Sequence, residues 1–247
     1  MRAQIALVGI LAVTAGSAQG IFEGGARFLG AEPGRPGRVV RNAPYSADVV
    51  TESSQTLPDG NHIRQSNTVH IVRDSEGRTR SEQSLRTLGG LAPNAHLPQV
   101  VFINDPVTNS NYALNLNSRT ATKSTVDRPP MRRPEGGFRR GGLDANSKVE
   151  SLGRQTMEGL AVDGTRTTLT VPAGQIGNDQ PLQVVTETWY SADLQTVVLS
   201  RRTDPRTGET VTRLTNVSRA EPAHSLFEVP ADFKVSESQN RPGRGPR

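Results

Sequence analysis

The sequence contains no cysteine among its 247 residues. Disulfides, thiolate nucleophiles and cysteine-based metal sites are therefore excluded together. Aromatic residues make up only 4% of the chain, and no apolar run reaches the length of a membrane-spanning helix. A sustained helical period is also missing, and one short turn is expected at Glu221–Phe227. A chain of this size can still bury a core without cross-links, and these absences favour a β protein.

The first residues have the features of an export signal. Arg2 precedes the apolar run Ile5–Val13, and the small residues Gly16-Ser17-Ala18 follow before Gln19. This order predicts a signal peptide at residues 1–18, with cleavage after Ala18, rather than a buried N-terminal helix. We therefore expect an exported protein, located in the periplasm or outside the cell.

The net charge of +5 is unevenly distributed. Three segments rich in Pro, Gly and Arg, at 26–41, 127–142 and 234–247, carry a net +3 each, so the rest of the chain is mildly acidic. Such segments cannot bury a core. We therefore predict a flexible basic segment at 19–44, a single β domain at 45–235 and a disordered basic tail at 236–247.

The domain is expected to contain a basic linker at 127–147. Its side chains are solvated, or they contact anionic lipid headgroups or polysaccharide. Nucleic acid is the least favoured partner, because a single Phe-Arg-Arg-Gly-Gly is not a repeated array and an exported protein rarely meets nucleic acid. The candidate surface-contact residues are Arg128, Arg132, Arg133, Phe138, Arg139 and Arg140.

From Tyr45 onward the chain alternates between β-rich runs and turn signals, such as Pro58-Asp59-Gly60-Asn61. About eleven strands in consecutive hairpins predict antiparallel pairing, and a sheet of that length must curl or close. The predicted fold is an all-β, strongly curved antiparallel sheet or incomplete barrel with minimal helix. The expected strands are 45–57, 62–74, 78–88, 99–104, 111–117, 120–126, 148–157, 161–171, 182–190, 196–202 and 210–218.

The concave face of such a sheet is the natural place for a ligand. Tyr112, Leu114 and Leu116 share one face of their strand by strict alternation, and they are candidate ligand contacts together with Trp189. For Trp189, packing in the core or at the rim is favoured over a platform for a sugar ring. The run Gln99–Asn104 is apolar on both faces and predicts a buried central strand.

Several segments follow one another in an order typical of a known family. These are the strand Ala47–Gln55, the pair formed by Val100–Ile103 and Tyr112–Leu116, the segment Gly159–Arg166, the Trp189-Tyr190 strand end and the closing Leu226–Val235. Over residues 45–235 the chain resembles the LolA/LolB-like superfamily of bacterial envelope proteins. The resemblance implies an exported curved sheet, in a group that includes lipoprotein carriers and the sensor domain of a periplasmic sigma-factor regulator.

Catalytic signals are sparse. His62 and His70 lie eight residues apart on one expected strand, about 26 Å, which is too far to share a metal ion. Hydrolase, zinc and phosphate-binding motifs are absent, and no cofactor is expected. Glu187, paired with Glu52 or Asp48, is the one carboxylate considered for catalysis, although an outward-facing strand glutamate is far commoner.

Three hypotheses remain. The first is an exported, non-enzymatic binding or structural protein of the bacterial envelope that holds a lipid-like or peptide ligand, or another envelope protein, on a concave sheet face. The second is an envelope scaffold or adhesion protein that contacts anionic lipid or polysaccharide through its Arg-rich segments. A hydrolase using Glu187 is the remote third.

Overall fold

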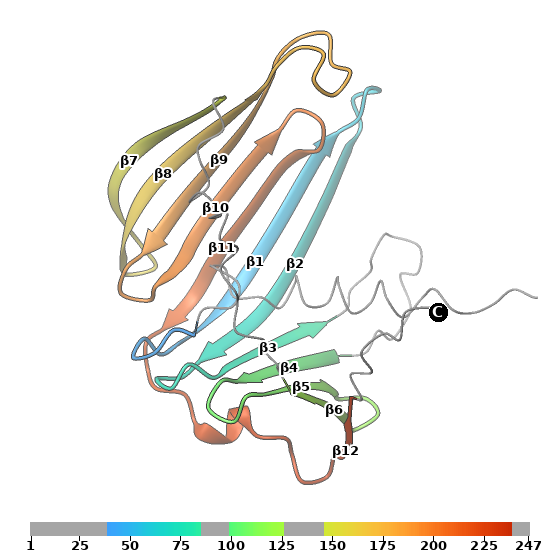
Figure 1. Cartoon of the computed structure of the whole chain (residues 1–247), viewed down its shortest axis with the longest axis vertical. Coiled ribbons are helices and arrows are strands. Elements are labelled where there is room, and N and C mark those ends of the chain that lie inside the picture. The colour runs from blue at the N-terminus through green and yellow to red at the C-terminus, as the bar shows by residue number, and fades with distance from the viewer. Residues whose placement is uncertain (1–38, 85–98, 126–145, 239–247) are drawn as a thin grey trace, which may run out of the picture.

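The computed structural model describes residues 39–84, 99–125 and 146–238, and these form one strongly curved, open sheet of twelve strands (Figure 1). The curved all-β fold expected from the sequence is confirmed. The predicted signal peptide lies outside the described residues, as do most of the N-terminal segment, most of the Arg-rich linker (127–147) and most of the tail (236–247). The strands are β1 (Tyr45–Thr56), β2 (His62–Arg73), β3 (Thr79–Ser84), β4 (Gln99–Asp105), β5 (Ser110–Asn115), β6 (Thr120–Thr125), β7 (Ser147–Met157), β8 (Leu160–Val171), β9 (Leu182–Ser191), β10 (Thr196–Asp204), β11 (Gly208–Ser218) and β12 (Lys234–Glu237).

The strand order is β12-β6-β5-β4-β3-β2-β1-β11-β10-β9-β8-β7. Two meanders, β1–β6 and β7–β11, therefore meet where β1 pairs with β11. The sheet bends sharply between β2 and β3, within the first meander, so that β3–β6 cross below the long strands in Figure 1. Within residues 39–84, 99–125 and 146–238 there is one 3₁₀ turn, η1 (His224–Phe227), on the C-terminal segment where the sequence predicted a turn.

The twelfth strand was not predicted. After η1 the chain returns beside β6, and β12 pairs with it in parallel, whereas every other pair is antiparallel. Lys234 N donates to Arg119 O at 3.0 Å, and Ser238 N donates to Lys123 O at 2.7 Å. Four exposed residues carry no recognisable alternation, so this strand results from tertiary contact rather than from a local pattern.

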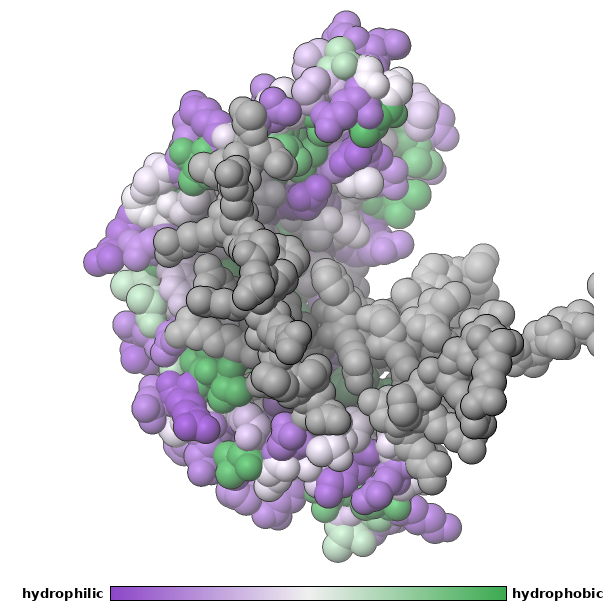
Figure 2. Space-filling view, in the orientation of Figure 1, coloured by the Kyte–Doolittle hydropathy of each residue, from purple (hydrophilic) through white to green (hydrophobic). Residues whose placement is uncertain are grey.

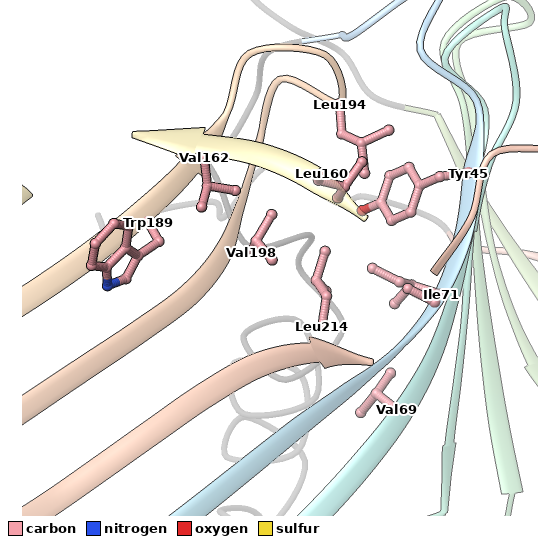
Figure 3. Close-up of a cluster of buried hydrophobic side chains, with 10 residues drawn as sticks. Tyr45, Val69, Ile71, Leu160, Val162, Trp189, Leu194, Val198 and Leu214 are labelled. Atoms are coloured by element: carbon pink, nitrogen blue, oxygen red, sulfur yellow. The ribbon is translucent and has the colours of Figure 1, made fainter. Parts of the chain in front are cut away.

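One end of the long strands holds the larger hydrophobic cluster (Figure 3). Cluster 1 gathers side chains from both meanders, and β-bulges at Val197/Leu199 and Ser46/Asp48 increase the local twist there. Trp189 is 7% exposed and belongs to this core, in agreement with the packing role favoured from the sequence. The buried members are Tyr45, Ala47, Val69, Ile71, Leu160, Val162, Trp189, Leu194, Val198 and Leu214.

A second cluster lies against β4–β6 and is covered by the C-terminal segment. The neighbours Ile71 and Val72 enter different clusters, because successive strand side chains point to opposite faces. Arg78 lies over the Phe227 ring, with 5.7 Å from its guanidinium carbon to the ring centroid, and its Nε donates to Asp74 at 2.5 Å. The buried members of cluster 2 are Val72, Val101, Ile103, Leu114, Ala121 and Phe227.

A buried arginine anchors the junction of the meanders. Arg73 is 1% exposed and lies over the Tyr45 ring, with 4.7 Å from its guanidinium carbon to the ring centroid. Its Nη2 donates to the carbonyl of Ala43 at 2.8 Å and also to that of Leu194, in the β9–β10 turn. A buried charge is tolerated only when its donors are satisfied, and here they tie β2 to two distant backbone segments.

Gly164 offers a test of the packing in cluster 1. A Cβ at this position would lie 2.5–2.7 Å from the indole ring of Trp189. We expect Gly164→Ala to cost about 1–3 kcal/mol of unfolding free energy, because a buried ring must move. The exposed neighbour variant Thr165→Ala should stay within about 0.5 kcal/mol of the wild type. Urea unfolding measures both, and equal midpoints for the two variants would contradict the packing described.

Candidate binding surface

The ligand contacts expected from the sequence are used in packing. Leu114 is buried in cluster 2, with Tyr112 and Leu116 packed against it, whereas Trp189 lies in cluster 1. The structure therefore does not bring the four side chains together. Arg128, Arg132, Arg133, Phe138, Arg139 and Arg140 all lie outside the described residues.

The histidines of β2 have separate partners. His62 Nδ1 lies 3.1 Å from Thr56 Oγ1, and His70 Nδ1 lies 2.8 Å from Asp48 Oδ1. Asn216 also donates to Asp48, and the hydrogen bonds from Asn216 and His70 lower the pKa of Asp48. No group of three metal-binding side chains occurs in the part of the chain that the structure describes.

The three carboxylates considered for catalysis do not converge. Arg166 holds Glu187 at 2.6 Å and Arg213 holds Glu52 at 2.6 Å, while Asp48 binds His70 and Asn216. Glu187 and Glu52 occupy one row across the sheet but are separated by β10 and β11, which is about 14 Å at the usual strand spacing. Paired glycosidase carboxylates lie about 5–9.5 Å apart.

The end of the long strands away from cluster 1 is mostly polar on both faces. We call it the polar half, and it comprises residues 51–56 and 62–68 of β1 and β2, with 147–151, 165–171, 182–188, 200–204 and 208–213 of β7–β11. A sheet ordinarily buries at least one face against another layer. Among the described residues, neither hydrophobic cluster extends over this half.

One face of the polar half is lined by hydroxyl groups. In the row from β7 through β8, β9, β10 and β11 to β1, every position is Ser or Thr, and Asn67 on β2 ends it. Thr51 Oγ1 and Thr212 Oγ1 lie 3.2 Å apart within this row. The six hydroxyl residues, in order across the sheet, are Ser151, Thr165, Thr188, Ser200, Thr212 and Thr51.

The next row on the same face continues this chemistry. Thr167, Thr186, Thr210 and Ser53 lie in register with one another, together with Val149, Arg202 and Gln65. Neighbouring hydroxyls along a row are about 4.8 Å apart, and the rows are separated by about 6.7 Å. We call these two rows the hydroxyl face. It carries one charged residue, Arg202, and no aromatic side chain.

The opposite face alternates in charge. One row runs Glu150, Arg166, Glu187 and Arg201 from β7 to β10, then Val211, Glu52 and Ser66 from β11 to β2. The next row begins with Lys148 and ends with Arg64. Opposite charges on neighbouring strands stabilise a sheet. We call this surface the charged face.

The turn between β10 and β11 lies at the end of the polar half. Asp204 is 3% exposed, and the side chain and backbone of Arg206 both donate to it, with Nη2 at 2.7 Å and the amide N at 3.0 Å. These bonds, led by that from the Arg206 side chain, hold the pKa of the Asp204 carboxyl well below its usual range despite its burial. The turn ends at Gly208, where φ is +90° and a Cβ would meet Ser54 O at 2.1 Å.

The two polar faces were missed from the sequence, although their signal is present. Several strands alternate Ser or Thr with charged residues, as in Thr186-Glu187-Thr188. This alternation was used to locate the strands but not to predict two different polar faces. Assembling the rows requires the register of β1 with β11, which joins residues about 160 positions apart.

No protein-family model and no curated protein matches the sequence. Among solved structures, the MucA/MucB complex of Pseudomonas aeruginosa is 14% identical over 79% of this chain, with a TM-score of 0.42, and this chain spans 59% of the one it matches. An uncharacterized conserved protein from Thermus thermophilus is 9% identical, over 79% of this chain and 91% of that one, with a TM-score of 0.41. A LolA superfamily protein from Nitrosomonas europaea is 10% identical, over 85% of this chain and 97% of that one, with a TM-score of 0.31.

The similarity to a LolA superfamily protein is thus a low one, at 10% identity and a TM-score of 0.31. At this identity and these TM-scores it implies nothing about a ligand or a partner. Within the described ranges, no helix has the length and apolar character needed to cross a bilayer.

Asp204 provides a stability test for the turn of the polar half. We expect Asp204→Asn to cost about 1–3 kcal/mol at pH 7, because the buried side chain at this position loses the charge that accepts hydrogen bonds from Arg206. The folded pKa lies below the unfolded value of about 3.9, so the stabilisation is complete above that value and is lost as the pH falls through the folded pKa. The difference in unfolding free energy between the wild type and the Asp204→Asn variant should therefore become smaller below about pH 4.

Chemical denaturation at pH 7, 5, 4 and 3 measures this difference. The exposed Asp179→Asn variant serves as the control and should match the wild type throughout. A difference that stays constant with pH would rule out the charged turn as its cause.

Proposed function

We propose that this chain is an exported, non-enzymatic binding protein of the bacterial envelope, and that the hydroxyl face binds a polar peptide segment of another protein. The observation that carries the proposal is the row of six in-register Ser and Thr residues on an ordered sheet face, next to a second row that holds four more. Such a row offers both donors and acceptors at every strand, at a spacing that an extended polar chain can follow.

An acyl ligand is less well supported. Most buried apolar side chains of the described residues are gathered in clusters 1 and 2, where they pack against one another, while Val184 is buried within the polar half. Elsewhere the hydrophobic residues are scattered in small groups on the face shown in Figure 2. A lipid carrier needs an apolar, open lumen, and none is formed by the rows of the polar half.

A glycan ligand also lacks its usual support. Sugar-binding surfaces place aromatic rings against the apolar faces of the sugar, and the hydroxyl face contains none. Trp189, the single tryptophan, is buried in cluster 1. A neutral, hydrogen-bonding peptide needs no such platform, and the near absence of charge on this face suits it.

An enzymatic role has little support in the site geometry. Glu187, Glu52 and Asp48 are each engaged by a different partner, and their separations do not suit paired carboxylate chemistry. The non-enzymatic assignment rests on this dispersal of the candidate groups.

A second proposed role concerns the Arg-rich segments. Among the described residues acidic side chains outnumber basic ones, so the positive net charge comes from the remainder of the chain. This segregation supports contact of residues 127–142 and the tail with anionic lipid or polysaccharide.

The hydroxyl face can be tested by removing hydroxyls at nearly constant shape. Peptides selected against the full chain from a random displayed library should be polar. The triple variant Thr51→Val, Thr188→Val, Thr212→Val should bind them about tenfold more weakly or worse, since each lost hydrogen bond contributes about 1 kcal/mol. The control Thr68→Val, Thr168→Val, Thr203→Val changes three threonines of the charged face and should leave affinity unchanged.

Fluorescence anisotropy measures these affinities, and organic extraction of the purified chain tests the carrier version in parallel. Stoichiometric acyl lipid in the extract would contradict the proposal. So would apolar selected peptides, or equal losses in the two triple variants.

The second role predicts salt-sensitive binding to vesicles of phosphatidylglycerol and phosphatidylcholine. Deleting Arg128–Gly142 and the tail from Asn240 should weaken sedimentation with these vesicles, and raising the salt should remove the difference because screening acts on exposed charges. Neutral phosphatidylcholine vesicles are the control. An unchanged salt profile after deletion would count against the role.

A further inference from the structure

The strand β7 forms one edge of the sheet, because it pairs only with β8 among the described strands. An edge strand exposes alternating N–H and C=O groups that can pair with another strand. Natural edges are usually blunted, and β7 is blunted in its second half, where a bulge between Ser151 and Gly153 interrupts the register and Gly153 has φ +80°. Its first half, Ser147–Ser151, pairs regularly with β8 and is free of bulges.

The backbone groups that face outward can be identified. Thr170 N donates to Asn146 O at 2.9 Å, and these two residues lie directly opposite each other in the β7–β8 register. In an antiparallel ladder, hydrogen-bonded and non-hydrogen-bonded pairs alternate. Residues 146, 148 and 150 therefore bond to β8, and Ser147, Val149 and Ser151 present both their N–H and their C=O to the open edge.

The side chains of this half-strand are self-complementary. Lys148 and Glu150 lie on the charged face and form an ion pair at 2.9 Å, with Arg166 opposite Glu150. Val149 lies on the hydroxyl face and is 45% exposed, as one of few large hydrophobic residues at the surface. The sequence Ser-Lys-Val-Glu-Ser is thus symmetric in size about Val149 and antisymmetric in charge.

We propose that β7 pairs antiparallel with β7 of a second copy of this chain, about a twofold axis through Val149. In this register Val149 faces the partner's Val149, Ser147 faces the partner's Ser151, and Lys148 faces the partner's Glu150. The three outward-facing residues of each copy then exchange all their backbone hydrogen bonds. The two oppositely charged pairs occupy the non-hydrogen-bonded positions, where side chains approach most closely.

The same register extends the charged face across the interface. The row Arg201, Glu187, Arg166, Glu150 continues with the partner's Lys148, so the sign of the charge still alternates from strand to strand. Any other register separates these opposite charges or places Lys148 beside a residue that does not balance it. Charge complementarity therefore selects a second copy over an unrelated strand.

The bulge at Leu152 limits the contact to about five residues a side. Such an edge contact is smaller than a standard interface, so the dimer should be weak, with a dissociation constant on the order of micromolar or higher. Sedimentation equilibrium of the full chain from about 1 µM to about 1 mM should show a reversible monomer–dimer equilibrium.

Three variants test the register. Val149→Pro removes an outward N–H without touching a bond to β8, so the fold should survive and the dimer should be lost. Lys148→Glu and Glu150→Lys each oppose like charges and should weaken self-association about tenfold. An equimolar mixture of these two charge variants should associate at least as tightly as the wild type, since Glu faces Lys at both positions. Far-UV circular dichroism verifies the fold of each variant.

A wild-type chain that stays monomeric at every concentration would overturn the proposal, even if β7 then accepted a strand from another protein. A dimer that is indifferent to Val149→Pro would place the contact elsewhere. Failure of the mixed charge variants to associate would refute the register. Peptide binding by the hydroxyl face is measured separately, so neither result decides the other.

Discussion

The pairing of β1 with β11 is the contact on which the rest of the molecule depends. It joins residues about 160 positions apart, and the hydrogen bond between Thr51 and Thr212 lies on this seam. Without it the two meanders would be separate sheets, and cluster 1, which draws side chains from both, could not form. Closing so long a loop costs chain entropy that only the completed cluster offsets, and we infer that the meanders form first and dock late.

The two ends of the long strands have different roles in the sheet. Near cluster 1 the side chains pack around Trp189 and Leu214, and bulges tighten the twist. Farther along the same strands the hydrophobic residues give way to hydroxyls on one face and alternating charges on the other. The packed end holds the strands in register, and this register makes the polar rows continuous. A binding surface of this kind is a property of the alignment between strands rather than of any local motif.

The alternation of residues in the sequence predicted the local features, which are the positions of the strands and turns. The strands around Tyr45–Thr56 and Leu182–Ser191 were located to within a residue, because the turn signals Pro58–Asn61 and Ser191–Asp193 follow them. Long-range features were not predictable in this way. The parallel strand β12 has no pattern of its own, and Tyr112, Leu114 and Leu116 were correctly placed on one face without any sign that the C-terminal segment covers it. Similarly, Glu187 attracted attention as an acid in a strand, whereas its partner Arg166 becomes visible only once β8 and β9 are aligned.

The short strand β12 has a consequence for how the protein avoids fibres. A sheet with two long bare edges can add copies at both ends and grow without limit. Here one end finishes in four exposed residues that begin with a lysine, laid in parallel against β6. So short an end is a poor template for a further strand. If the proposed dimer forms, growth is restricted to the β7 side, where the twofold contact uses up the free edge, and addition of further sheets stops at a closed pair.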